Sequence, residues 1–226
     1  ANGAPDCKYR KLEVKVNRPG VDVRTRAGYY AMCAERLQAP ESRMSPNTGD
    51  LGMAGLFAPA GLPLRAVAIP LGPSQEPGKV DVGVVLTVKL PASPTAVDEK
   101  LTVTRNLYDA TGKPGPPIQD TRSILVPRSG NDELRYDVHY TWPLAPGRYE
   151  IRLNAKSQAL DRNGSVYVPI DVPDHSRAAI ALGGLWLGTR PVDGVERTDP
   201  FSASLPIVPT TARDFEPNVQ LAAAVR

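Results

Sequence analysis

Hydrophobic and polar residues alternate with period two along much of the chain. The clearest case is residues 80–90, where Val82, Val84, Leu86 and Val88 share one side of an extended backbone. A strand with this alternation buries one face and exposes the other to water. The same reading predicts strands at Leu64–Ile69, Val80–Leu90, Leu101–Asp109, Ile118–Val126, Glu133–Trp142, Gly147–Ala155, Ser165–Val172, Ala178–Leu187 and Val219–Val225.

Turn-forming residues separate these runs. Gly, Pro, Asn and Asp provide the backbone angles that tight turns require, and they gather at residues 109–112, 114–117, 129–132, 145–147 and 161–164. About seven to nine short strands without amphipathic helices between them indicate an antiparallel β-sandwich. We therefore predict an all-β chain in which residues 64–226 form a sandwich of the immunoglobulin or fibronectin type III kind.

The first part of the chain, residues 1–37, predicts a separate β-hairpin. Apolar residues alternate with polar ones on both sides of Arg18-Pro19-Gly20, at Leu12, Val14, Val16, Val21 and Val23. Pro followed by Gly suits the two central positions of a type II turn. If Arg18 faces Val21, the numbers of paired residues sum to 39. Because an isolated two-stranded hairpin is marginal in water, we expect its apolar face to dock on the sandwich, on the linker or on a second copy of the chain, with Val219–Val225 as a plausible neighbour.

Residues 38–63 are predicted to be a linker between the hairpin and the sandwich. This stretch contains four prolines and four glycines and shows no sustained period. We expect one short helical turn near Asp50–Phe57, capped by Thr48 or Asp50, whose side-chain oxygens suit that role.

Composition and charge narrow the classes of protein. The chain has 226 residues and a formal net charge of +3, which argues against a dedicated nucleic-acid binder. No apolar run approaches the roughly 20 residues of a membrane-spanning helix. Because no segment resembles a signal peptide, we expect a mature form or an excised fragment.

Cys7 and Cys33 are the only cysteines. In the register that sums to 39, Cys7 lies opposite Met32, one residue from Cys33, which is close enough for slight fraying to allow a disulfide. Such a bridge would indicate an oxidising compartment. Two free buried thiols are the alternative, and the sequence leaves both open.

The residues offer little catalytic or metal-binding chemistry. His139 is expected on the solvent side of a strand and His175 in a loop, and no nucleophile elbow accompanies either. Asp161-Arg162-Asn163-Gly164 resembles the Asp-x-Asn-Gly part of a calcium-binding loop. If Asp161 were position 1 of an EF-hand loop, position 12 would be Val172 rather than the required Glu. These four residues suit a hairpin turn better. We expect no catalytic residue, no metal ligand and no cofactor, and therefore no enzyme.

Four aromatic residues raise the question of a carbohydrate platform: Trp142, Trp186, Tyr29 and Tyr30. Large aromatics more often seal the core of a sandwich. We favour that interpretation for both tryptophans.

The N-terminal hairpin carries a family resemblance. Lys8-Tyr9-Arg10-Lys11, Arg18-Pro19-Gly20, Arg24, Arg26 and Gly28-Tyr29-Tyr30 resemble the closing segment of the von Willebrand factor A-related domains of acidobacterial secreted proteins. The sandwich that follows in those proteins is similar to this chain at Pro146-Gly147-Arg148-Tyr149, Asn163-Gly164-Ser165, Val172-Pro173, Ala181–Leu185 and Thr211–Phe215. The Asp-x-Ser-x-Ser motif of the family's metal site does not occur here, so that site is not carried over to any residue.

The resemblance implies a non-enzymatic accessory, adhesion or protein-interaction module of a secreted, periplasmic or cell-surface protein. The expected partner is a protein or another extracellular ligand, with no nucleic acid and no membrane span. Self-association through the hairpin or the C-terminal strand edge is a further expectation. The alternative function is an ancillary, glycan-binding domain of an extracellular hydrolase.

Overall fold

The computed structural model describes residues 9–11, 28–30, 61–128, 133–175, 182–192, 197–215, 217 and 219–225. The chain divides into two compact units, Ala1–Thr48 and Gly49–Arg226. The helical turn expected near Asp50–Phe57, with its cap, lies outside the described residues.

The first unit contains a short antiparallel pair of strands. β1 (Tyr9–Lys11) pairs with β2 (Gly28–Tyr30), and Tyr9 lies opposite Tyr30 and Lys11 opposite Gly28. The pairing sums to 39, so the register predicted from the turn is confirmed at these positions. The turn itself, at Arg18-Pro19-Gly20, lies outside the described residues, as do the apolar residues that flank it.

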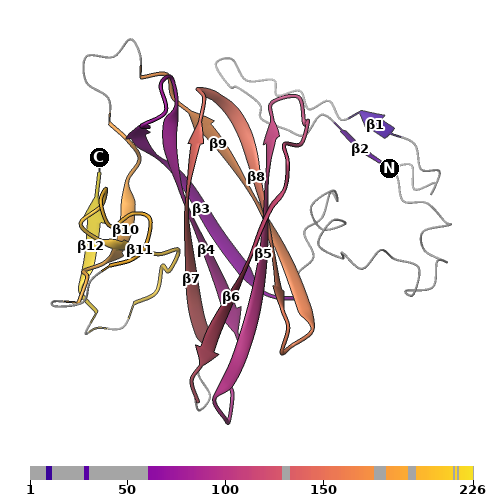
Figure 1. Ribbon diagram of the computed structural model, residues 1–226, viewed down its shortest axis with the longest axis vertical. Coiled ribbons are helices and arrows are strands. Elements are labelled where there is room, and N and C mark those ends of the chain that lie inside the picture. Colours follow the sequence, from indigo (N-terminus) through magenta and orange to yellow (C-terminus); the bar gives the residue numbers. More distant parts are fainter. Residues whose placement is uncertain are drawn as a thin grey trace, which may run out of the picture. The chain divides into compact units, whose positions relative to one another are not determined.

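The second unit is built around two antiparallel sheets (Figure 1). The three-stranded sheet has the order β3-β4-β7 and consists of β3 (Leu64–Pro73), β4 (Val80–Leu90) and β7 (Leu134–Leu144). The four-stranded sheet has the order β6-β5-β8-β9 and consists of β5 (Val97–Asp109), β6 (Ile118–Val126), β8 (Gly147–Ser157) and β9 (Arg162–Val172). The predicted all-β sandwich is confirmed.

Inward-facing side chains of the two sheets form the main core. Its buried residues include Val82, Val84, Leu86, Val88, Leu101, Val103, Val138, Ile151 and Leu153. These are the positions that the period-two pattern places on one face of each strand. Burying each such side chain contributes roughly 1.5–3 kcal/mol, so this layer is the main source of stability.

One side of the sandwich is closed where the start of β9 meets the residues before β3. The Leu62 N–H donates to the Asn163 carbonyl at 2.9 Å. A Cβ added at Gly164 would lie 2.0 Å from the Leu62 carbonyl oxygen, so only glycine allows this approach. The expected turn at Asp161–Gly164 is therefore wrong in its placement. The turn ends at Asp161, which has a φ of 47°, and Asn163 and Gly164 belong to β9.

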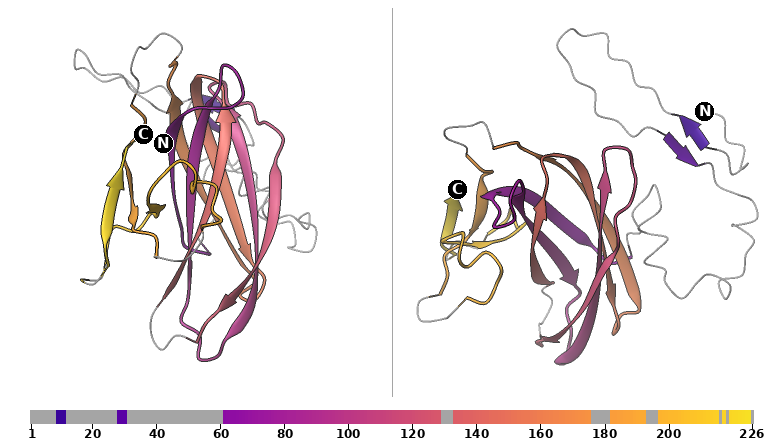
Figure 2. Two further views of the ribbon diagram at one scale, coloured as in Figure 1. Left: turned by 60° about the vertical axis from the view of Figure 1, so that its left-hand side comes forward. Right: turned by 45° about the horizontal axis from the view of Figure 1, so that its top comes forward.

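A third layer covers the outer face of the three-stranded sheet (Figures 1 and 2). It contains β10 (Trp186–Thr189), β11 (Val208–Pro209) and β12 (Leu221–Ala224) in the order β11-β10-β12. Trp186, Phe201, Leu205 and Ile207 pack there with Leu71 and Val85 as a second core.

This layer corrects the prediction that Ala178–Leu187 and Val219–Val225 are strands of the sandwich itself. Only Trp186 and Leu187 of the first range are strand residues among those described, and both segments belong to the separate sheet. The physical reason is that the outer face of the three-stranded sheet is itself apolar, with Val67, Ile69 and Val85. A sheet that is apolar on both faces needs a cover on each.

Candidate interaction site

The side of the sandwich opposite the β3–β9 contact is open. There the edges of β6 and β7 and residues 198–200 surround a cleft of about 500 Å³. Its lining is mostly polar: Arg105, Asp120, Arg122, Asp137, His139, Tyr140, Thr141, Thr198, Asp199 and Pro200. The cleft therefore brings together strands from both sheets and the C-terminal segment.

An ion network crosses this open side from one sheet to the other. Asp120 on β6 lies 3.6 Å from Arg105 Nη1 and 3.1 Å from Arg122 Nε. The Tyr140 hydroxyl on β7 donates to the same carboxylate at 3.2 Å. One carboxylate thus receives two guanidinium groups and a hydroxyl, and it ties β5, β6 and β7 together.

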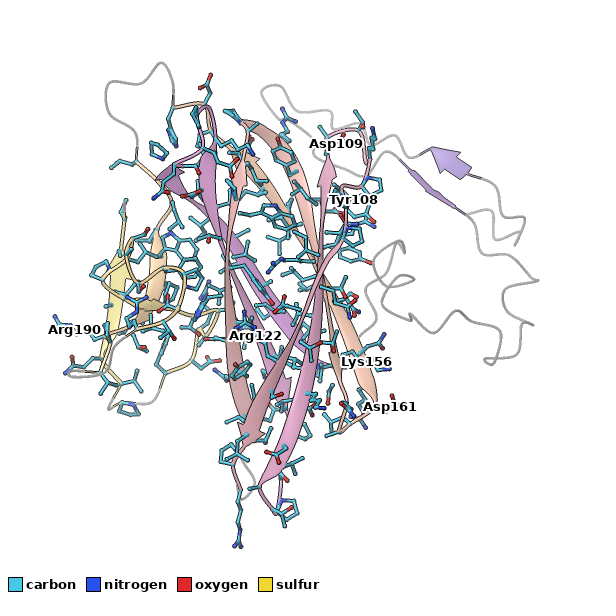
Figure 3. The ribbon with its side chains drawn as sticks, viewed as in Figure 1. Tyr108, Asp109, Arg122, Lys156, Asp161 and Arg190 are labelled. Carbon is cyan, nitrogen blue, oxygen red and sulfur yellow. The ribbon has the colours of Figure 1, made fainter. Side chains whose placement is uncertain are left out.

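Both arginines also stack on the ring of Tyr140. The guanidinium carbons of Arg105 and Arg122 lie 4.2 Å and 5.5 Å from the ring centroid. The Arg105 side chain is 21% exposed and the Arg122 side chain 42%. Arg122 is therefore the group in this network that a partner can reach, and Figure 3 labels it beside β7.

The titration behaviour of the cleft favours fixed polar contacts. Burial raises the pKa of the Tyr140 hydroxyl well above its usual value, and the charge of Asp120 raises it further against the opposing effect of the arginines. Partial burial by itself would raise the pKa of Asp199, but hydrogen bonds from Arg197 and from the Phe201 N–H hold it below its usual value. At neutral pH Tyr140 is a protonated donor and Asp199 an ionised acceptor.

The wall of the cleft is anchored to the C-terminal layer. His139 Nε2–H donates to the Pro209 carbonyl at 2.8 Å, and the His139 ring meets Phe201 edge to face at 5.2 Å. The Thr87 hydroxyl hydrogen bonds to Asp137 and lies 2.6 Å from the Thr211 hydroxyl. The expectation that His139 faces solvent is therefore wrong, because the outer face of β7 is covered.

The outer face of the four-stranded sheet carries a second polar arrangement. The Arg152 guanidinium carbon lies 3.9 Å from the Tyr108 ring centroid and 4.8 Å from that of Tyr167. Its Nε also pairs with Glu150 at 2.7 Å. Figure 3 labels Tyr108 near the end of β5. This row holds three strands of the sheet together.

A second hollow, of about 560 Å³, lies beside the turn between β8 and β9. Its buried carboxylate, Glu99, accepts hydrogen bonds from the Ser157 hydroxyl at 2.7 Å and from the Gln158 N–H at 2.8 Å. Glu99 therefore stabilises that turn, and we assign the hollow a structural role.

The residues singled out from the sequence are dispersed. Cys7 and Cys33 lie outside the described residues, so their bridge stays a prediction. Trp142 packs against the main core of the sandwich, as predicted. Trp186 is also buried, at 1% exposed, but it lies in the second core outside the sandwich rather than in the sandwich core. Tyr29 and Tyr30 lie on β2, but their side chains are not described.

Sequence reasoning missed the ion network, although one signal was available. Arg105 stands between Val103 and Leu107 on the inward face of β5, and Asp120 and Arg122 occupy inward positions of β6. A charge at an inward position must be paired. Such a charge therefore indicates that a pairing partner lies nearby in the fold.

Comparisons with known proteins leave the family open. No family model matches the chain, and no curated protein matches it. Among solved structures, a β-glucuronidase of Bacteroides uniformis matches with 9% identity and a TM-score of 0.33, covering 56% of this chain. A target of the Northeast Structural Genomics Consortium matches with 14% identity and a TM-score of 0.34, covering 54% of this chain and 94% of that one.

The chain spans only 14% of the glucuronidase that it matches.

Within the described part of the chain, no group of three or more His, Cys, Asp and Glu residues is placed to hold a metal ion. No helix among the described residues is long and apolar enough to cross a membrane.

Proposed function

We propose that the chain is a non-catalytic protein-interaction module that binds a partner protein at the cleft beside β6 and β7. The observation that carries this proposal is the pair of arginines held against Tyr140 where both sheets present an edge. Arg is, with Trp and Tyr, one of the residue types that most often dominate the binding energy of protein interfaces. Here Arg122 is the accessible residue, and Tyr140, which is only 6% exposed, supports it from within.

The geometry supports binding in two ways. Stacking and the Asp120 ion pairs hold Arg122 in place before a partner arrives, so little side-chain freedom is lost on binding. The edge of β7 lies along the same cleft and offers backbone groups to an extended segment. The matching partner presents an extended segment with a carboxylate that pairs with Arg122 as a bidentate acceptor.

The protonation states in the cleft also support a binding role over a catalytic one. A Tyr140 hydroxyl that stays protonated and an Asp199 that stays ionised do not exchange protons near neutral pH. General acid–base catalysis works best with a group whose pKa lies near the working pH.

We further propose that the module belongs to a von Willebrand factor A-related protein that is secreted, periplasmic or on the cell surface. This rests on the resemblance of residues 8–30 and of the sandwich motifs. The complete open reading frame tests it, because an Asp-x-Ser-x-Ser motif upstream of this chain is expected. Its absence there would remove the family assignment.

The binding proposal is tested with the full chain immobilised as wild type, as Arg122→Glu and as Arg148→Glu. Arg148 is exposed near the start of β8, in the same four-stranded sheet, and it does not line the cleft, so its substitution is the matched control. Extracellular proteins of the source organism are passed over the three forms, and any protein retained is purified and its affinity measured by calorimetry. Thermal unfolding of each variant confirms that it folds.

We expect Arg122→Glu to weaken binding by about tenfold or more and Arg148→Glu to leave it within about threefold. Retention of no protein, or equal affinity for all three forms, contradicts the proposal. Turnover of a glycoside, ester or peptide by the wild-type chain would also contradict it. Specific binding on a glycan array would instead favour the glycan-binding alternative.

A further inference from the structure

The last strand, β12, has one edge that faces no other strand among the described residues. The sheet order places β12 at the end, beside β10. The Arg190 N–H donates to the Gln220 carbonyl. The backbone groups of residue 220 therefore point toward β10. Because these directions alternate along a strand, Leu221, Ala223 and Val225 direct their N–H and C=O groups away from β10.

β12 also lacks the features that normally protect such an edge. Charged residues and proline on an edge strand discourage pairing with other chains. The other edge strands of the second unit carry them: Arg65 and Pro70 on β3, Asp120 and Arg122 on β6, Arg135 and Asp137 on β7, Arg162 and Pro169 on β9, and Pro209 on β11. Residues 219–225 contain neither a charge nor a proline.

The same residues present apolar side chains on the outward face of the sheet. Leu221 is 53% exposed and Val225 51%, whereas Ala222 and Ala224 pack against the second core. Leu185, which is 58% exposed, lies on the neighbouring stretch before β10. Exposed apolar residues therefore adjoin an edge whose backbone groups point outward.

We propose that a second copy of the chain pairs with this edge, β12 against β12, antiparallel about a two-fold axis at Ala223. In this register Leu221 lies opposite the partner's Val225, and Ala223 opposite the partner's Ala223. All three residues with outward backbone groups become hydrogen-bonded pairs. The strand is thus complementary to itself, as a two-fold interface requires.

The absence of charge on β12 favours a second copy over a charged partner. At the two-fold axis residue 223 faces its own copy, so a charge at that position would face a like charge. A neutral alanine at the axis, flanked by Leu221 and Val225, avoids that repulsion. The three-stranded C-terminal sheets of the two copies then join into one six-stranded sheet.

The first test measures the mass of the full chain by light scattering and analytical ultracentrifugation from low to high micromolar concentration. Ala223→Lys places like charges at the axis, and Val192→Lys is the matched control because Val192 is 72% exposed in a loop. We expect a concentration-dependent dimer for the wild type and for Val192→Lys. Ala223→Lys should raise the dimer dissociation constant by about tenfold or more. A wild-type chain that stays monomeric overturns the proposal, and so does an Ala223→Lys chain that dimerises normally.

The second test reads the register and does not depend on the lysine variant folding. In the antiparallel pair the two Cα atoms of residue 223 lie about 5.5 Å apart, within disulfide range. Ala223→Cys should therefore form a 223-to-223 disulfide dimer on mild oxidation, identified by mass spectrometry of the linked peptides. Leu125→Cys, at a residue 66% exposed on β6, is the control and should not link. Equal linking of both variants, or a dimer linked only through other cysteines, contradicts the proposal.

Discussion

The two outer faces of the sandwich differ in solvent exposure: one is covered by a third layer and the other is exposed. The face of the three-stranded sheet is buried under the C-terminal layer, where Val85 is fully buried and Trp186 is 1% exposed. The face of the four-stranded sheet carries polar residues such as Thr102 and Thr121, which hydrogen bond to each other in the open. One sheet is therefore the middle layer of three, and the other is an outer layer.

The difference is visible in the central strands. In the middle of β4 the residues facing away from the main core are Gly83, Val85 and Thr87, and all three are buried. On β5 the corresponding residues are Thr102, Thr104 and Asn106, of which the first two are only partly buried. The chemistry of the outward positions, rather than that of the inward ones, decides whether a sheet needs a third layer.

Gly83 shows how close this third layer comes. A Cβ added there would lie 2.6 Å from the Trp186 ring and 2.9 Å from the Phe201 ring. The two rings themselves pack at 5.3 Å between centroids. The missing side chain on β4 is thus the space into which the C-terminal aromatics fit.

The largest expected effect comes from removing the same side chain from each region. Leu205→Ala truncates a residue 2% exposed in the second core and should cost about 2–5 kcal/mol of unfolding free energy. Leu125→Ala, at a residue 66% exposed on the outer face of the four-stranded sheet, should change the unfolding free energy by no more than about 0.5 kcal/mol. Urea unfolding of both variants measures the contrast. Similar costs would mean that the C-terminal layer is not a true part of the core.

The next effect is overpacking at the glycine notch. Gly83→Ala should destabilise by about 1–3 kcal/mol, because its Cβ meets two buried rings that have little room to move. Gly115→Ala is the control, since its Cβ would only reach ordinary contact distance, 3.4 Å, from the Leu107 carbonyl. Thermal unfolding compares the two. A neutral Gly83→Ala variant would show that the aromatics do not press on β4.

Much of the sandwich could be predicted from the sequence, because a strand with one buried face and one exposed face shows an alternation of apolar and polar residues. The strands from β3 to β9 follow that signal, and the register of β1 with β2 follows from one turn. The third layer could not be predicted in this way. Its strands are short, and their inward residues, Trp186 and Gly188, show no long alternation.

The signal for the third layer lay in β4 instead. From Val82 to Val88 every second residue is a large apolar one, but Gly83 and Val85, between them, are not polar. A strand with one solvent-exposed face would have polar residues at those positions. A strand that is apolar on both faces indicates cover on both. The cleft was missed for a related reason, because His139, Tyr140 and Asp199 come together only once the C-terminal segment lies on β7.

A smaller effect is expected from the arginine on the open face. Arg152→Ala removes the stacking on Tyr108 and Tyr167 and the ion pair with Glu150, and it should cost about 1 kcal/mol. Arg148→Ala, four residues earlier at an exposed position on the same face, should cost no more than about 0.5 kcal/mol. Denaturant unfolding compares the pair. A cost for Arg152→Ala as large as that of Leu205→Ala would break the comparison, because the open face would then contribute as much as the covered one.

The smallest effect concerns acid and the attachment of the C-terminal layer. Asp199 has a pKa below its usual value in the folded protein because of hydrogen bonds from Arg197 and from the Phe201 N–H. The folded chain therefore holds this proton less tightly than the unfolded chain, whose aspartates titrate near about 3.9. The resulting stability is present in full above that value and is lost as the pH falls through the lower, folded pKa.

Asp199→Asn should therefore be less stable than the wild type at neutral pH, and the difference should shrink as the pH falls below about 4. Urea unfolding across that range measures it. Asp161→Asn is the control, because it makes the same substitution at a side chain that is 90% exposed. Tryptophan fluorescence adds a local reading, since Trp186 lies in the layer that Asp199 helps to attach and Trp142 lies in the main core. A difference between Asp199→Asn and wild type that stays constant down to strongly acidic pH would mean that this carboxylate does not hold the covered face in place.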